Sequence, residues 1–267
     1  GDNTITQRNT PVQVCNVGST NCAADPLTSV SKISTGYSHT CALKTDGTVY
    51  CWGYNGQGQL GDNTITQRNT PVQVLNVGVT GNFAGASQIS AESKHTCALK
   101  TDGTVYCWGN NSYGQLGVGD NTTQRVTPVQ VLKGAASGDT TYLGDGTIKV
   151  SQINTGDNHT CALKTDGTVY CWGYNSYGQL GDNTTNTRLI PVQVCNVGST
   201  NCTTNPLTGV SYISAGYYHT CALKTDGTVY CWGSNSNGQL GDNTITQRNT
   251  PVQVCNVGST NCAADPL

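Results

Sequence analysis

Cysteines and histidines are the side chains of this chain with the widest chemical range, and all of them recur at fixed spacings. Each HTC is followed ten residues later by the Cys of YCWG, and each CNVGSTNC holds a second kind of pair seven residues apart. Thiols at repeated spacings could bind metal ions or form disulfides. The pairs are Cys41 with Cys51, Cys97 with Cys107, Cys161 with Cys171, Cys221 with Cys231, Cys15 with Cys22, Cys195 with Cys202, and Cys255 with Cys262.

Hairpin geometry favours disulfides at the longer spacing. ALKTDGTVY predicts two strands joined by a three-residue loop at 45–47. Counting outward from Lys44 opposite Thr48 places Cys41 directly opposite Cys51, close enough for a bridge between the two strands.

The shorter spacing fits a hairpin as well. A two-residue turn at 18–19 in CNVGSTNC places Cys15 opposite Cys22. Structural zinc sites use cysteines about two to four residues apart in clustered pairs, which neither spacing resembles. We therefore predict seven disulfides, no metal site and no cofactor. Because disulfides persist in oxidising compartments, they predict an extracellular protein, either secreted or displayed on a cell surface.

The four histidines occupy one equivalent position, directly before Thr-Cys: His39, His95, His159 and His219. A metal-binding or catalytic histidine in every repeat is one interpretation. The favoured one is structural, an imidazole that satisfies backbone groups between strands. An enzyme usually breaks its repeat symmetry at one site, because acid, base and nucleophile need different environments. No repeat here does so recognisably, and we predict no catalytic residue and no enzymatic activity.

The segments that carry these side chains are repeated in tandem. Residues 241–267 copy residues 1–27 without a change, and HTCALKTDGTVYCWG occurs four times. A unit of about 60 residues buries too little apolar surface alone, so neighbouring units must stack. The division is repeat 1 at 1–60, repeat 2 at 61–118, repeat 3 at 119–180, repeat 4 at 181–240, and the start of repeat 5 at 241–267.

Each repeat reads as four short strands. PVQV, an alternating stretch such as VSKIS, HTCALK and TVYCWG are separated by Gly, Asn, Asp and Pro. No segment has helical periodicity. We predict an all-β fold of tandem four-stranded antiparallel blades of the β-propeller type, with the Trp of each YCWG buried between blades.

HTCALKTDGTVYCWGYNGQGQLG closely resembles the repeat of the regulator of chromosome condensation family, H-x-x-A-L-x-x-D-G-x-V-x-x-W-G-x-N-x-x-G-Q-L-G, and all four repeats carry it. The resemblance implies blades that close as a seven-bladed propeller in that family, but it does not imply one activity. The nuclear member exchanges nucleotide on a small GTPase and contacts chromatin, whereas this chain has paired cysteines and no basic surface. It is more similar in environment to secreted members, among them a β-lactamase inhibitor, which indicates a secreted, disulfide-rich variant of bacterial type.

The arithmetic of the repeats favours an open arrangement. A propeller ring closes when the first and last strands of the chain join in one blade. Here a second copy of the opening segment already follows the fourth YCWG, so ring closure does not require residues 1–27. We expect an open or continuing array rather than a closed seven-bladed ring. Closed rings within a longer parent protein are the alternative.

Composition narrows the class of partner. Charged residues make up 10% of the chain and the formal net charge is -2, so the surface attracts nucleic acid poorly and lets like surfaces pack. No apolar run has the length of a membrane span, and no membrane insertion is expected. We predict a non-catalytic structural protein that forms or decorates a filament or surface fibre through self-association of its blades. The alternative is a secreted propeller module, an adhesin or inhibitor, that captures a protein or glycan on its loop face; an intracellular exchange factor is disfavoured.

The connections that follow PVQV vary in length and are candidate contact loops. In the third repeat, the segment 135–149 predicts an extra hairpin about Gly144, Asp145 and Gly146. Glycosylation sequons in turn-like segments make Asn121 and Asn183 the best candidate glycosylation sites.

Overall fold

The computed structural model describes residues 1–134, 140–259 and 261–267, and it folds them into four separate four-stranded antiparallel sheets. We call these sheets blades 1 to 4. Within each blade the strands lie side by side in chain order.

Blade 1 contains β1 (Val30–Thr35), β2 (His39–Lys44), β3 (Val49–Gly53) and β4 (Arg68–Gln73). Blade 2 contains β5 (Ala86–Glu92), β6 (His95–Lys100), β7 (Val105–Gly109) and β8 (Arg125–Gln130). Blade 3 contains β9 (Val150–Thr155), β10 (His159–Lys164), β11 (Val169–Gly173) and β12 (Arg188–Gln193). Blade 4 contains β13 (Val210–Ala215), β14 (His219–Lys224), β15 (Val229–Gly233) and β16 (Arg248–Gln253). A 3-10 turn, η1 (Val77–Val79), lies between β4 and β5.

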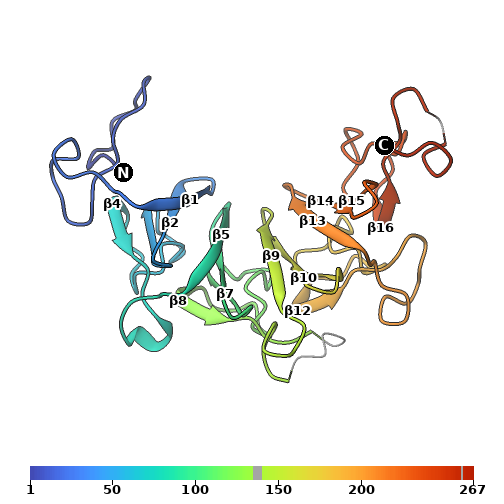
Figure 1. Cartoon of the computed structure of the whole chain (residues 1–267), viewed down its shortest axis with the longest axis horizontal. Helices are drawn as coiled ribbons and strands as arrows, with labels where there is room; N and C mark the ends of the chain where they lie inside the picture. The colour runs from blue at the N-terminus through green and yellow to red at the C-terminus, as the bar shows by residue number, and fades with distance from the viewer. Residues whose placement is uncertain (135–139, 260) are drawn as a thin grey trace.

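The blades are arranged along an arc (Figure 1). Strands β1, β5, β9 and β13 face its concave side, and the two chain ends lie at its opposite extremes (Figure 1). All four inner strands line one shared cavity through residues that include Ile33, Ala91, Asn154 and Ser214. Among the described residues no strand of blade 1 pairs with blade 4. The expected array of propeller-type blades, open rather than closed, is therefore confirmed.

The register of the central hairpins follows from their turn. Gly47 has φ 81°, a left-handed conformation that glycine adopts at little cost, and its N–H donates to Lys44 O at 3.0 Å. Cys41 consequently lies opposite Cys51, as the three-residue loop predicts. The same register recurs in the other blades, and all four pairs form disulfides.

The three cysteine pairs at the shorter spacing also form disulfides, but their segments are not simple hairpins. Cys15 pairs through its backbone with Pro26 rather than with Cys22, so the predicted hairpin register is wrong. The reason is a local turn. The carbonyl of Asn21 accepts the N–H of Asp25 at 2.9 Å, which carries the chain past Cys22 before it returns.

The described part of the segment 135–149 forms no extra hairpin; residues 135–139 lie outside the described residues. Tyr142 makes an isolated bridge with Leu132. The carboxylate of Asp145 accepts the backbone N–H groups of residues 140, 141 and 142 at 3.0 to 3.1 Å. A side chain therefore satisfies the donors that a second strand would have used.

The blades are offset from the sequence repeats. The repeat boundary at 60–61 falls between β3 and β4, so the outer strand of blade 1 lies in the next sequence repeat. Residues 8–13 have the same sequence as β16, RNTPVQ, yet they form no strand. A strand needs a partner, and residues 1–27 contain no HTCALK or TVYCWG segment to supply one.

The hydrophobic core lies between the blades. One cluster joins Cys41, Leu43 and Val49 of blade 1 to Ala98 and Trp108 of blade 2. Two further clusters join blades 2 and 3 and blades 3 and 4 in the same way. The predicted location between blades is confirmed for Trp108, Trp172 and Trp232, whereas Trp52 is half-buried at the end of blade 1, which has no preceding blade. Each blade depends on its neighbour for its core.

We expect the inner disulfides to contribute more stability than the outer ones. Both spacings close short loops, each worth about 2–3 kcal/mol in the loop-entropy model. Cys161 and Cys171 are fully buried, however, and their replacement by Ala also removes packed sulfur atoms. Urea denaturation of the double variant Cys161→Ala, Cys171→Ala should show a larger drop in midpoint than Cys255→Ala, Cys262→Ala. Equal drops would contradict the importance of the buried pairs.

Candidate binding faces

Among the described residues, no group of three or more His, Cys, Asp or Glu side chains could hold a metal ion. All fourteen cysteines are in disulfides. None of the described segments forms a helix of the length and apolarity that a membrane span requires. Three contact surfaces can be distinguished among the described residues.

The first surface is the contact between consecutive blades, which uses one repeated set of hydrogen bonds. Between blades 2 and 3, the imidazole Nε2 of His95 contacts Thr160 Oγ1 at 3.0 Å. Thr160 Oγ1 donates to the carbonyl oxygen of Gln115 at 2.9 Å, and Trp172 Nε1 donates to the same oxygen at 2.9 Å. The contacts of blades 1 with 2 and 3 with 4 repeat this arrangement. We call it the His–Thr–Gln–Trp relay.

The relay and burial together set the protonation state of its histidines. The Thr160 hydroxyl hydrogen is donated to Gln115 O, so the hydrogen of the His95–Thr160 bond must come from His95 Nε2. The His95 ring is neutral because it is fully buried and its Nδ1 atom has no partner among the described residues. Burial lowers the pKa of His95 and His159 to about 3 and that of His39 to about 4. The structural interpretation of the histidines holds, although their partner is a side-chain hydroxyl of the next blade and not a backbone group.

Inner strands add a second link between blades. The side-chain amide of Gln88 on β5 donates to Ile153 O and accepts from Ile153 N on β9, both at 3.1 Å. Gln152 clamps Ile213 in the same way, at 2.9 Å for both bonds. The equivalent residue of blade 4, Tyr212, is 54% exposed.

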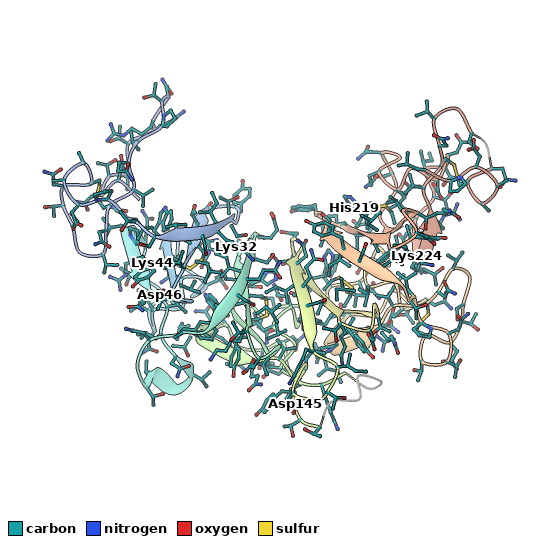
Figure 2. All side chains as sticks on the ribbon, viewed as in Figure 1. Lys32, Lys44, Asp46, Asp145, His219 and Lys224 are labelled. Atoms are coloured by element: carbon teal, nitrogen blue, oxygen red, sulfur yellow. A yellow bond between two sulfur atoms is a disulfide. The ribbon has the colours of Figure 1, made fainter. Side chains whose placement is uncertain are left out.

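The second surface consists of the two open ends of the arc. On blade 4, neither His219 Nε2 nor the carbonyl of Gln239 has a hydrogen-bond partner among the described residues; Figure 2 shows His219 on this end blade. On blade 1, Thr40 Oγ1 and Trp52 Nε1 likewise have no acceptor there. The open ends thus expose the two halves of one relay.

The space around equivalent glycines also differs between an internal blade contact and the open end of blade 4. A Cβ atom at Gly178 would lie 2.7 Å from the backbone of Asn249 in the next blade. At Gly238, the equivalent position of blade 4, a Cβ atom would meet nothing within 4 Å. A hollow at that end is lined by Gly238, Gly241 and Asn243.

Residues 1–27 contact blade 1 in the way that the loop between the third and fourth strands of each blade contacts the next blade. The N–H of Asn3 donates to Asn69 O at 3.1 Å, as that of Asn183 donates to Asn249 O at 2.9 Å. Gly1 also lies against Trp52, as Gly61 lies against Trp108. The opening segment therefore mimics the outer part of a preceding blade.

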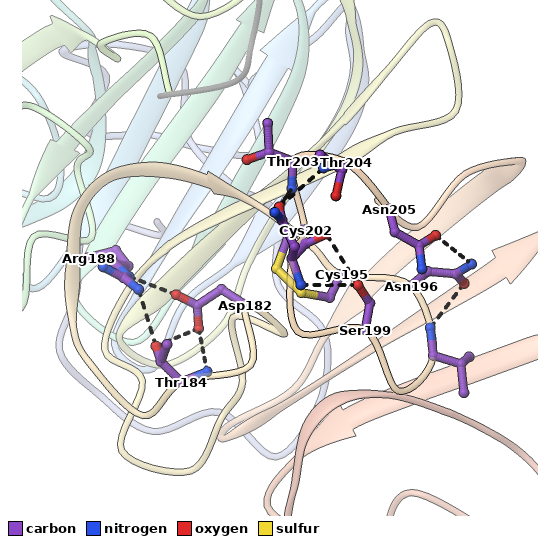
Figure 3. The surroundings of a disulfide bond; sticks show 12 residues. Asp182, Thr184, Arg188, Cys195, Asn196, Ser199, Cys202, Thr203, Thr204 and Asn205 are labelled. Atoms are coloured by element: carbon purple, nitrogen blue, oxygen red, sulfur yellow. Dashed lines mark hydrogen bonds and ion pairs between the residues drawn. A yellow bond between two sulfur atoms is a disulfide. The ribbon is translucent and has the colours of Figure 1, made fainter.

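Each outer loop is closed by one carboxylate. In Figure 3, Asp182 accepts from Thr184 and pairs with Arg188 at 2.7 Å, beside the Cys195–Cys202 disulfide. These bonds make the GDNT segments turns. The candidate glycosylation sites Asn121 and Asn183 are both exposed, and their modification stays a prediction.

The third surface is a row of tyrosines on the turns between the first and second strands and the loops after the third strand. Tyr113, Tyr174 and Tyr177 lie in the loops, and Tyr217 and Tyr218 lie in the last turn. Neighbouring rings of this row have centroids 4.4 to 6.2 Å apart. We call this surface, with Tyr37 and Tyr54 of blade 1, the tyrosine face.

Sequence reasoning missed the tyrosine face because it concentrated on loop length. The sequence signal lies in the residues that follow each WG and in those that precede each repeated histidine, in GYSH, ESKH, GDNH and GYYH. These positions vary while the strands beside them are identical, and in repeat proteins such variation marks a binding face.

Known proteins share sequence and fold with this chain. The sequence model of the RCC1-like domain family matches residues 1–265. The chain is 32% identical over 230 residues to the ultraviolet-B receptor UVR8 of Arabidopsis thaliana, covering 84% of this chain and 46% of that protein. It is 33% identical over 247 residues to the probable E3 ubiquitin-protein ligase HERC4 of Homo sapiens, covering 89% of this chain and 21% of that protein. The chain thus spans less than half of these relatives.

Among solved structures, the chain is similar to yeast RCC1 (Prp20) bound to Kap60, with a TM-score of 0.65 and 25% identity. The match covers 86% of this chain and 50% of that one.

One matched pair of substitutions measures the relay. Thr160→Val keeps the side-chain shape but leaves the buried His95 donor unpaired, which should cost about 1–3 kcal/mol. Thr40→Val removes the same hydroxyl where it has no partner and should change stability by less than about 0.5 kcal/mol. Urea denaturation of both variants checks this, and equal costs would show that the relay contributes nothing.

The buried histidines should make the protein acid-sensitive. Their pKa is lowered in the folded state, so the unfolded chain binds protons first, and stability is lost as pH falls from about 6.5 toward 4. The loss approaches about 1.4 kcal/mol per pH unit for each buried histidine. Glu92, whose pKa is raised by burial, opposes this weakly, and Asp242, whose pKa is lowered, acts at lower pH.

Melting temperatures measured between pH 8 and pH 4 test this expectation. The variant His159→Gln should flatten the pH dependence, whereas His219→Gln, at the half-buried open end, should flatten it less. A wild-type melting temperature that does not change across this range would contradict the assignment of neutral, buried imidazoles.

Proposed function

Because the chain belongs to the RCC1-like domain family, we propose that it is a non-catalytic, extracellular protein-binding module whose partner is a further blade of its own kind. Stacking at the open ends then builds a filament or surface fibre. The family is consistent with protein binding, since the yeast relative is described in a complex with Kap60. The activities of the much longer UVR8 and HERC4 proteins are not transferred.

The observation that carries the proposal is the complementarity of the two open ends. Blade 4 offers the donor His219 Nε2 and the acceptor Gln239 O. Blade 1 offers Thr40 and Trp52, the residue types that complete the relay in all three internal contacts. Blade 1 therefore presents to blade 4 of an incoming copy the same surface that blades 2, 3 and 4 each present to the blade before them.

Residues 1–27 do not prevent this contact, because they can be exchanged. The segment 241–267 of the incoming copy has the same sequence and can take over the contacts of residues 1–27 with Trp52 and Asn69. The exchange preserves those contacts and adds the relay. The low net charge of -2 keeps repulsion between copies small.

The extracellular location is supported by the cysteines. Seven disulfides in 267 residues are typical of secreted or cell-surface proteins. This content supports the secreted part of the proposal, and the bacterial type is proposed only from the resemblance to secreted family members.

A second candidate function is a secreted module, an adhesin or inhibitor, that captures a protein or glycan on its loop face. The tyrosine face favours it, because this surface differs from blade to blade while the blade contacts do not. The two functions use different surfaces and are compatible with one another.

Analytical ultracentrifugation over a range of concentrations tests stacking. The wild-type chain should form species that grow with concentration, because each end stays open after every addition. Thr40→Arg and His219→Arg each place an unpaired charge in one end and should give monomers when measured alone. An equimolar mixture should give dimers and nothing larger, since one intact contact remains.

A wild-type chain that stays monomeric at all accessible concentrations would contradict stacking. Growth that continues in either single variant would show that another surface joins the copies. Val79→Arg, on an exposed outer loop, controls for the added charge and should behave as wild type.

A further inference from the structure

The tyrosine face contains two adjoining cavities. The larger, of about 500 Å³, is lined by residues of all four blades, among them Tyr113 of blade 2 and Tyr218 of blade 4. The smaller, of about 230 Å³, lies toward blade 1 and includes Tyr54. Both are bordered by Tyr37, Ser93 and Lys94, so they form one continuous groove across the blades. The larger cavity lies within the range of about 300–1,000 Å³ typical of ligand sites.

A network of side-chain amides forms the floor of the larger cavity. Gln115 Nε2 donates to Asn110 Oδ1 at 2.8 Å and to Asn158 Oδ1 at 3.3 Å. Asn110 Nδ2 donates to Gln57 of blade 1, and Asn158 Nδ2 donates to the nearly buried carboxylate of Asp157. The polar groups of the groove are therefore held in place before any ligand arrives.

The equivalent glutamines of blades 1 and 3 lack such partners. Gln59 and Gln179 are fully buried, and their Nε2 atoms have no acceptor among the described residues. The positions that supply Asn110 and Asn158 around Gln115 hold Tyr54 and Lys94 around Gln59, and Tyr174 and Tyr218 around Gln179. Two buried amide donors without an acceptor consequently lie next to residues that line the groove, although neither glutamine lines it itself.

We propose that the tyrosine face is a binding site for a neutral, extended carbohydrate chain. Pyranose rings present C–H groups that pack on the negative faces of aromatic rings, and the groove is bordered by exposed tyrosines. Sugar hydroxyls both donate and accept, which matches the polar side chains of Asp157, Asn110 and Asn158 that line the larger cavity. This inference rests on the second candidate function and is independent of stacking.

Charge favours a neutral ligand. The lining residues carry one cation, Lys94, and one anion, Asp157. A strongly basic or acidic ligand would meet repulsion from one of them, and a neutral polyhydroxylated chain can bond to both.

A polypeptide is the competing ligand, because tyrosine, serine and asparagine also build antibody paratopes. Peptide partners usually insert an apolar anchor into a well-packed apolar pocket. Tyrosine is the only apolar-bodied residue type along both cavities, and no Leu, Ile, Val or Phe is among the described lining residues. The groove therefore fits sugar rings laid across tyrosines better than an aliphatic anchor.

Isothermal titration calorimetry with neutral oligosaccharides tests the proposal at protein concentrations where the chain is monomeric. Cellohexaose, xylohexaose, maltohexaose, mannohexaose and chitohexaose serve as probes. At least one should bind, with an affinity that added salt does not change. Tyr37→Ala combined with Tyr217→Ala removes two exposed rings and should weaken that affinity about tenfold or more.

Tyr212→Ala is the matched control, because Tyr212 is as exposed as Tyr217 but lies on β13 outside both cavities. It should bind the sugar as wild type does. The proposal is overturned if no probe binds, if the double variant retains full affinity, or if Tyr212→Ala weakens binding equally. Binding of a decaproline peptide in the absence of any sugar binding would assign the face to polypeptides instead. None of these results depends on whether the open ends stack.

Discussion

The structure depends on the contact between consecutive blades. Each four-stranded sheet is too small to enclose a core, and its apolar residues meet those of the next blade. The relay adds direction to that apolar contact, because His95 and Gln115 lie on one side and Thr160 and Trp172 lie on the other. An apolar interface alone could slide, whereas buried donors and acceptors are satisfied in one register only. The same directionality leaves the His and Gln groups of a relay at one end of the arc and the Thr and Trp groups at the other.

The disulfides solve a different problem. Repeats that are nearly identical could exchange strands or cysteines with one another during folding. Each bridge spans only seven or ten residues, so it closes within its own hairpin or loop. The covalent bonds thus define each blade, and the noncovalent contacts join the blades. Variation is then tolerated on the turns and loops outside the shared contacts, where the tyrosine face lies.

The sequence predicted those features that depend on residues close to one another along the chain. The opposition of Cys41 and Cys51 follows from a loop of known length, and the all-β blade follows from alternating strands. The pairing of Cys15 with Pro26 was not predictable by counting, because a local turn at Asn21 changes the register. The partners of His39, His95 and His159 lie 57 to 65 residues away, which no local pattern indicates. The tyrosine face emerges only when four blades bring their variable turns together.

Native-state hydrogen exchange offers the most direct test of dependence on neighbours. The segment HTCALKTDGTVYCWG is identical in all four blades, so its intrinsic exchange rates are the same. In blade 3 every residue of β10 is buried, whereas β14 of blade 4 is partly exposed. The account predicts that the amides of β6, β7, β10 and β11 exchange more slowly than the equivalent amides of β14 and β15. Equal protection in all blades would contradict it, because each sheet would then be stable without the blade beside it.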